Sequence, residues 1–311
     1  MAKGNSSSTA QAERQYHDTQ AAYVLPNDEI EQDRLDAQAS AIVEMIGGHP
    51  CLAPTLSMVG MLKAVDVGCG TGIATMQIAE MFPSATVHGV DLSDVPTAVQ
   101  KIAPPNIVWT KGNILDIRYE DDTGRMSAST EPVAQIFKPG SLNYIFGRML
   151  FLGINDWHRY FSTSARALKS GGIIEHQDLD WAFYRTATSQ RLDNEWEWHR
   201  AVMSALKKTG LSPQAGSNAA ELMKASGLEI ISMQTFEFSF VPCEKAFNSI
   251  AMGHYVQQKL VPQYPELLRK MLEIDGITGS RIKDLTDQAL NDISSEKGIH
   301  QKYTVTVARK P

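Results

Sequence analysis

The chain has 311 residues, with 29 lysines and arginines against 35 aspartates and glutamates, which gives a formal net charge of -6. This balance, without a clustered basic stripe, argues against nucleic acid as a partner, because phosphate binding depends on positive charge. No apolar run approaches the roughly 20 residues that cross a bilayer, and the three cysteines are too far apart to suggest a disulfide framework or a zinc site. We therefore expect a soluble, cytoplasmic protein with neither a membrane partner nor a metal site.

Strand-like and helical patterns alternate along the chain, which is typical of an α/β protein. Residues 1–22 are mostly small and polar and are expected to form a flexible tail. Residues 23–60 are interpreted as a helical lid segment, whose helix is capped by Asn27 or Asp28. The remaining residues, 61–311, are expected to form one domain with helix-rich inserts at about 181–215 and 243–295.

Three glycines on alternate positions follow a short apolar run in the stretch Val65-Asp66-Val67-Gly68-Cys69-Gly70-Thr71-Gly72. Because glycine lacks a Cβ, it adopts positive φ readily and lets the backbone approach a ligand closely. A dinucleotide fingerprint would need a further glycine where Ile73 stands, and no Gly-Lys-Ser/Thr follows to make a phosphate loop. The stretch predicts a nucleotide-binding turn of another kind, with a purely structural turn as the alternative.

Later strands end in polar residues at the same edge of the predicted sheet. Asp91 follows the strand at 86–90, at the distance beyond Gly72 where βαβ nucleotide sites place an acid that accepts ribose hydroxyls. A solvated carboxylate is the alternative. Arg148 follows the strand at 142–146, where it could meet a carboxylate of a ligand, unless it is simply an exposed arginine.

The strand at 173–178 becomes polar at its end, in Glu175-His176-Gln177-Asp178. His176 is the first candidate for a general base, since an imidazole titrates near neutral pH and this one follows a strand at the active edge. Asp178 is the second candidate. The alternative is that His176 only hydrogen-bonds to a neighbouring helix.

Together, the glycine turn, Asp91, the turn at Asn113-Ile114 and the succession of strands up to Gly171-Gly172 resemble a class I methyltransferase that uses S-adenosylmethionine (SAM), over about residues 60–240. A finer pattern resembles the fungal LaeA-like methyltransferases of secondary metabolism, and it consists of Tyr23–Asp28, Glu31–Asp36, Gly147-Arg148, Asn155–Trp157 and Glu175–Asp178.

This resemblance implies a Rossmann-like, seven-stranded sheet that is mostly parallel, with the last strand antiparallel. It implies cofactor contacts from Tyr23, Asp66, Gly68, Cys69, Gly70, Gly72, Asp91, Leu92, Asn113, Ile114 and Arg148. Asn113 and Ile114 would lie beside the adenine, although Asn113 could instead be an ordinary turn residue. Asn143 departs from the family pattern, since many relatives carry an acid in this strand, so no base is assigned there.

The resemblance predicts an enzyme that moves a methyl group from SAM to O, N or S of a small-molecule acceptor and forms S-adenosylhomocysteine. Two other functions stay open. One is a SAM-binding enzyme of the pericyclase type that does not methylate, and the other is a LaeA-like regulatory protein. The inserts at 181–215 and 243–295 are expected to shape the acceptor pocket.

Overall fold

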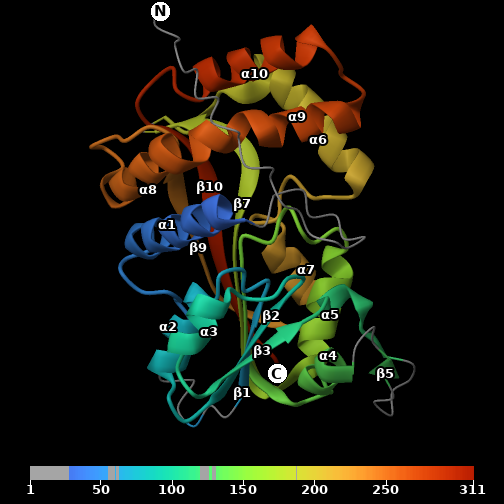
Figure 1. The fold of residues 1–311 in the computed structure, drawn as a ribbon. Helices are drawn as coiled ribbons and strands as arrows, with labels where there is room; N and C mark the ends of the chain where they lie inside the picture. Colours follow the sequence, from blue (N-terminus) through green and yellow to red (C-terminus); the bar gives the residue numbers. More distant parts are fainter. Residues whose placement is uncertain (1–27, 55–59, 61–62, 120–125, 128–130, 187) are drawn as a thin grey trace, which may run out of the picture.

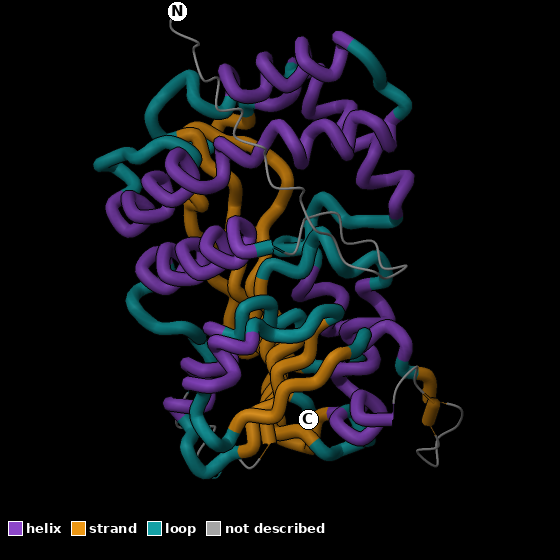
Figure 2. The backbone as a smooth tube through the Cα atoms, viewed as in Figure 1, coloured by secondary structure: helices purple, strands orange, loops and turns teal. Residues whose placement is uncertain are grey.

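The computed structural model describes residues 28–54, 60, 63–119, 126–127, 131–186 and 188–311, and one twisted sheet runs through it (Figures 1 and 2). The strands lie in the order β3-β2-β1-β6-β7-β10-β9, and β8 is added beside β7. Neighbouring strands in this order are parallel except at β10, which is antiparallel to both β7 and β9. This arrangement confirms the predicted class I methyltransferase fold.

The strands of this sheet are β1 (Lys63–Val67), β2 (Thr86–Asp91), β3 (Ile107–Lys111), β6 (Leu142–Arg148), β7 (Leu168–Arg185), β8 (Gln190–Arg191), β9 (Glu229–Ser239) and β10 (Ile299–Arg309). A separate pair consists of β4 (Arg118–Tyr119) and β5 (Met126–Ser127).

Helices cover both faces of the sheet, with α2 and α3 on one side and α4, α5 and α7 on the other (Figure 1). A second group, α6 and α8 to α10, gathers at the opposite end of the molecule from the C-terminus, and α1 lies between the two groups. The helices are α1 (Glu29–Met45), α2 (Ile73–Met81), α3 (Thr97–Ile102), α4 (Glu131–Ile136), α5 (Trp157–Ala167), α6 (Glu197–Thr209), α7 (Ala219–Ala225), α8 (Ile250–Tyr255), α9 (Tyr264–Asp275) and α10 (Ser280–Asp292). Across the described part of the chain, none of these helices is long and apolar enough to span a membrane.

Strand β7 continues far beyond the rest of the parallel sheet. Its pairing with β6 ends at Arg148 and Gln177, but its pairing with β10 continues as far as Arg185 and Ile299. The sequence analysis placed residues 181–185 at the start of a helix-rich insert, and this was wrong. These residues stay in the strand because β10 pairs with their backbone while Trp181 and Phe183 are buried under the second group of helices.

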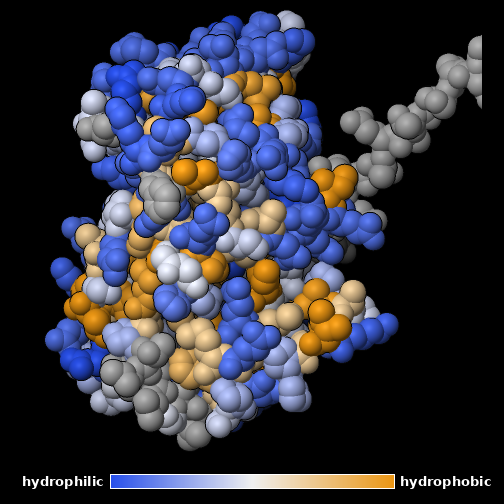
Figure 3. All heavy atoms as spheres, turned by 90° about the vertical axis from the view of Figure 1, so that its left-hand side faces the viewer, coloured by the Kyte–Doolittle hydropathy of each residue, from blue (hydrophilic) through white to orange (hydrophobic). Residues whose placement is uncertain are grey.

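The second group of helices encloses this extension. On the face shown in Figure 3, the part of the surface formed by these helices is mainly hydrophilic, whereas apolar side chains are more frequent lower down. The apolar sides of α6 and α9 are buried inside, for example at Val202 and Leu268. The extension and its helices thus form an apolar interior next to the parallel sheet.

A buried carboxylate in β7 fixes the chain segment between α1 and β1. Glu175 is fully buried, and it accepts the backbone N–H groups of Leu52, at 2.8 Å, and Ala53, at 2.7 Å. The side chains of Gln177 and Tyr144 donate to the same carboxylate. Burial raises the pKa of Glu175, and these donors oppose the rise because they favour the charged form.

We predict that Glu175→Leu destabilises the protein by about 3 kcal/mol, because two buried N–H groups lose their acceptor. Denaturant unfolding followed by circular dichroism measures the change. Glu229→Leu is the matched control, since Glu229 pairs with Arg309 at 2.7 Å in an exposed ion pair, and such pairs contribute about 1 kcal/mol or less. Equal losses in the two variants would contradict the anchoring role.

Candidate functional site

The glycine turn after β1 lies at the carboxyl edge of the sheet. Gly68, Gly70 and Gly72 have positive φ, at +68°, +56° and +87°. A Cβ on Gly68 would lie 2.4 Å from Leu150, and one on Gly72 would lie 2.6 Å from Trp109, so packing excludes a side chain at both positions. At Gly70 the nearest atom would be a methyl of Leu35 in α1, at 3.7 Å, which is an ordinary van der Waals contact, so packing does not exclude a Cβ there.

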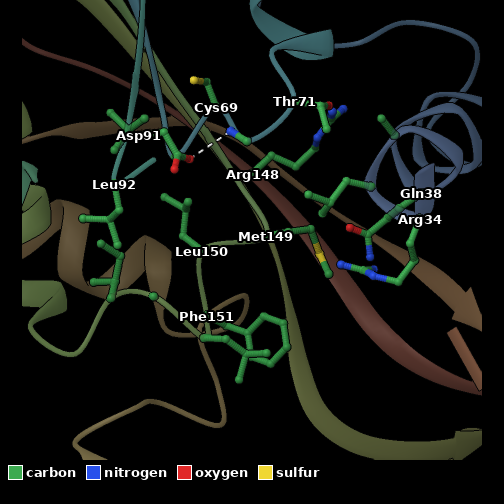
Figure 4. Close-up of a pocket in the computed structure, with 18 of the residues that line it drawn as sticks. Arg34, Gln38, Cys69, Thr71, Asp91, Leu92, Arg148, Met149, Leu150 and Phe151 are labelled. Carbon is green, nitrogen blue, oxygen red and sulfur yellow. Dashed lines mark hydrogen bonds between the residues drawn. The ribbon is translucent and has the colours of Figure 1, made fainter. Parts of the chain in front are cut away.

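The Asp91 carboxylate holds this turn from the end of the neighbouring strand. One oxygen accepts the N–H of Gly70, at 2.9 Å, as the dashed line in Figure 4 shows, and the other accepts the N–H of Ser93, also at 2.9 Å. Thr71 links the turn to α1, because its hydroxyl donates to Asp36 at 2.6 Å. A carboxylate has about four acceptor sites. Asp91 can therefore accept ribose hydroxyls while it holds the turn.

A cavity of about 210 Å³ lies between the glycine turn, the ends of β2 and β6, and α1. The predicted site residues that line it are Gly68, Cys69, Gly70, Asp91, Leu92, Asn113, Ile114 and Arg148. Within the described part of the chain, the predicted contacts Asp66 and Gly72 do not line it, and Tyr23 lies outside that part. Asn113 is fixed at the wall because its side-chain oxygen accepts the N–H of Leu115 at 2.9 Å.

Arg148 brings positive charge to the cavity from the end of β6. Its Nη1 atom is buried and has no hydrogen-bond partner among the described residues. Its guanidinium carbon lies 5.9 Å from the centre of the Phe146 ring, which is within the range of a cation–π contact. A buried guanidinium nitrogen without an acceptor is costly, so the site fits a ligand that carries an anionic group.

Asp66 lies beneath the turn and connects β1 to α2. Its carboxylate is buried and accepts the hydroxyl of Thr75 at 2.6 Å. Burial raises the pKa of Asp66 to about 7, although the bond from Thr75 and the charge of Arg148 favour the ionised form. The position of Asp66 therefore corresponds to an anchor for the turn, and its predicted contact with the cofactor stays a prediction.

His176 and Asp178 are fully buried on the α5 side of β7, and among the described residues neither lines the cavity. The His176 ring lies 5.0 Å from the ring of Trp157 and 5.4 Å from that of Phe161, measured between centroids. The Asp178 carboxylate accepts the N–H of Leu150 at 2.9 Å and so holds the loop after β6. These positions do not support the predicted base role, and we assign both residues to the packing of the core.

Two residues of α1, which lies in the predicted lid segment, line the cavity although the sequence did not single them out. Arg34 and Gln38 are almost fully buried, and both line the cavity from the side opposite Asp91 and Leu92 (Figure 4). The Arg34 guanidinium donates to both oxygens of Glu31 and to the Tyr255 hydroxyl. Glu31, Arg34 and Gln38 recur at helical spacing beside the apolar face of α1, and this spacing was the available signal.

The fold and the site together are those of a class I methyltransferase whose cavity lies at the glycine turn, where proteins with such sheets bind nucleotides. A family model described as a methyltransferase domain matches residues 40–233, so the chain belongs to this methyltransferase family. The chain is 31% identical to the secondary metabolism regulator laeA of Coprinopsis cinerea over 53% of this chain and 37% of that protein. It is 28% identical to methyltransferase str2 of Strobilurus tenacellus over 52% of this chain and 51% of that protein.

The matched segment thus spans about half the length, or less, of these two curated relatives. Among solved structures, phosphoethanolamine N-methyltransferase 2 of Haemonchus contortus, in complex with SAM, is similar with a TM-score of 0.45 and 18% identity. That likeness covers 81% of this chain and 49% of the other chain, and we draw no functional conclusion from it.

SAM is the cofactor of this family, as the sequence predicted, and the residues of the cavity fit it. Gly70 lines the cavity with backbone alone, Asp91 has acceptor sites for hydroxyls, and Arg148 has a buried donor for a carboxylate. Within the described residues, no three His, Cys, Asp or Glu side chains gather as a metal site would require.

The burial of His176 makes the free energy of unfolding depend on pH in the acidic range. It lowers the pKa of His176 from 6.5 to about 3, so the unfolded chain takes up a proton between these values while the folded chain does not. The free energy of unfolding therefore rises with pH across this window, by up to about 1.4 kcal/mol per pH unit from this group.

We predict that His176→Phe, which suits the surrounding aromatic rings, removes this contribution. Urea unfolding of the natural protein and the variant at several pH values between 4 and 7 measures it. The difference between the two free energies should change steadily below pH 6.5 and level off above it. A difference that is independent of pH would show that the imidazole is not held neutral in the core.

Proposed function

We propose that this protein transfers a methyl group from SAM to O, N or S of a small-molecule acceptor. One observation carries the proposal: the glycine turn, the Asp91 carboxylate and the Arg148 guanidinium all line the same cavity. These groups match the adenosyl hydroxyls and the amino-acid carboxylate of SAM. The proposal keeps the cytoplasmic setting that the three widely spaced cysteines favour.

Each cofactor-facing residue has a distinct part in the proposal. Asp91 accepts hydrogen bonds from the ribose hydroxyls, and Asn113 and Ile114 bound the adenine from the turn after β3. Arg148 pairs with the carboxylate of the methionine moiety. Leu92 packs beside the ribose at the end of β2. Tyr23 stays a proposed contact from the lid segment.

The chain itself contributes mainly position and exclusion of water. SAM supplies a methyl group on a positively charged sulfur, which is reactive enough that orientation provides much of the rate. Helix α1 covers the cavity on one side, and the loop Met149–Ile154 closes it on another. Among the described lining residues, the carboxylates are Asp91, the last residue of β2, and Asp94, shortly after it, both at the cofactor end. We therefore assign no general base among the described residues.

A regulatory role is the second candidate, because several curated relatives are named secondary metabolism regulators. A mass-spectrometric screen with SAM and aromatic, polyketide and peptide-derived acceptors separates the two. A methylated product that appears together with S-adenosylhomocysteine supports the enzyme. A SAM-binding protein that yields no methylated product and purifies with a stable protein partner supports the regulator.

We predict that Gly70→Arg lowers the affinity for SAM at least one hundredfold, because the new side chain would occupy the cavity at the glycine turn. Titration calorimetry with SAM and with S-adenosylhomocysteine measures this. Gly140→Arg is the matched control, because Gly140 has a similar φ of +62° but nothing within 4 Å of its Cβ position. Natural protein that fails to bind SAM, or equal binding by the two variants, would overturn the cofactor assignment.

A further inference from the structure

The cavity continues beyond the cofactor residues into the extension of β7, β9 and β10. We call this end the apolar compartment and define it by the lining residues Phe151, Leu179, Trp181, Phe238, Phe240 and Tyr264. The compartment is shaped by elements that are far apart in the sequence, since its residues come from β7, the end of β9, α9 and the loop after β6. Its wall is therefore fixed by the packing of the extension.

Charged groups on the described cavity wall lie elsewhere or are already paired. Asp91, Asp94 and Arg148 follow β2 and β6 at the cofactor end. Arg34 lines the cavity from α1, but its guanidinium is neutralised by both oxygens of Glu31. A charged ligand in the apolar compartment would lose its hydration without gaining a counter-charge, which is strongly unfavourable.

Two buried hydrogen-bond donors stand out in this apolar surface. Gln301 and Trp181 are each only 3% exposed and both line the cavity. Gln301 Nε2 and Trp181 Nε1 have no hydrogen-bond partner among the described residues. Buried donors are normally paired, and leaving one unpaired is costly. Two residues that line the cavity thus each carry an unpaired buried donor, and a bound group that accepts hydrogen bonds would satisfy both after a small rotation of their side chains.

The two donors belong to neighbouring, paired strands of the extension. Gln301 of β10 is opposite Phe183 of β7, and Trp181 precedes Phe183 by two positions, next to a register shift in β10. In a regular ladder diagonal neighbours are about 7–8 Å apart, within reach of long side chains, and the register shift changes this spacing locally. One or two oxygen atoms of a single small molecule could therefore accept from both.

We propose that the apolar compartment binds an uncharged, largely apolar acceptor molecule whose carbonyl or ether oxygen accepts hydrogen bonds from Gln301 and Trp181. The proposal rests on the methyltransferase function, because it describes the second substrate of the same cavity. Gln301 and Trp181 act as specificity-determining residues: they orient the oxygen of the acceptor, while the aromatic side chains hold its apolar body.

Equilibrium dialysis with three probes of the same shape tests the proposal on the full chain, with and without saturating S-adenosylhomocysteine. The probes are 2-acetonaphthone, 2-ethylnaphthalene and 2-naphthoate, which present a carbonyl, no oxygen and a negative charge. We expect the ketone to bind about five- to tenfold more tightly than the hydrocarbon, as one or two hydrogen bonds would give. The carboxylate should bind at least tenfold more weakly than the ketone.

Three variants connect the preference to the named donors. Gln301→Leu and Trp181→Phe should each remove most of the advantage of the ketone over the hydrocarbon, and Gln301→Leu should not lower the melting temperature, because it removes an unpaired buried group. Thr306→Val is the matched control. Thr306 is also in β10, its hydroxyl is also buried and unpaired within the described residues, and it does not line the cavity, so the advantage of the ketone should persist.

The proposal is overturned if the carboxylate binds as tightly as the ketone, if none of the probes binds, or if the ketone keeps its advantage in both donor variants. The probe-binding experiment gives its answer whether or not the protein binds the cofactor. If the ketone preference follows Gln301 and Trp181 but S-adenosylhomocysteine does not bind, the compartment is confirmed and the proposed methyl transfer fails.

Discussion

The hydrogen bond from the Gly70 N–H to the Asp91 carboxylate joins the ends of two neighbouring parallel strands, and the rest of the site depends on it. It holds the glycine turn in a conformation with positive φ, in which the close packing against Leu150 and Trp109 excludes side chains at Gly68 and Gly72. The backbone can therefore line a ligand cavity where a strand end would otherwise be filled. One carboxylate thus shapes the site and supplies acceptors to it.

The long β7, β9 and β10 strands add a second wall that the parallel sheet alone lacks. The parallel part ends at the cofactor residues, whereas the extension continues under α6, α8, α9 and α10. Its interior contains buried aromatic side chains such as Trp181, Phe238 and Phe240, and the part of the covering helices seen in Figure 3 is mainly hydrophilic on the outside. A polar end, to which we assign the cofactor, and an apolar end, for which we propose the acceptor, meet in one cavity, as transfer of a methyl group between two bound molecules requires.

The sequence predicted the local features well and the long-range ones poorly. The glycine turn, Asp91 and Arg148 were recognisable because each follows a strand, and strand ends in a parallel sheet meet at one edge. His176 was misjudged because the same rule does not say which face of the sheet a side chain takes, and here α5 packs over it. Gln301 was not found, because its place in the cavity is determined by pairing across more than a hundred residues.

The central claim is that one cavity holds SAM at the glycine turn and an acceptor in the apolar compartment. A crystal structure of the protein with S-adenosylhomocysteine tests it most directly. The account predicts ribose hydroxyls hydrogen-bonded to Asp91, the carboxylate of the ligand on Arg148, and the sulfur turned toward Trp181 and Phe238. Ligand density outside this cavity, or a sulfur turned away from the apolar compartment, would contradict it.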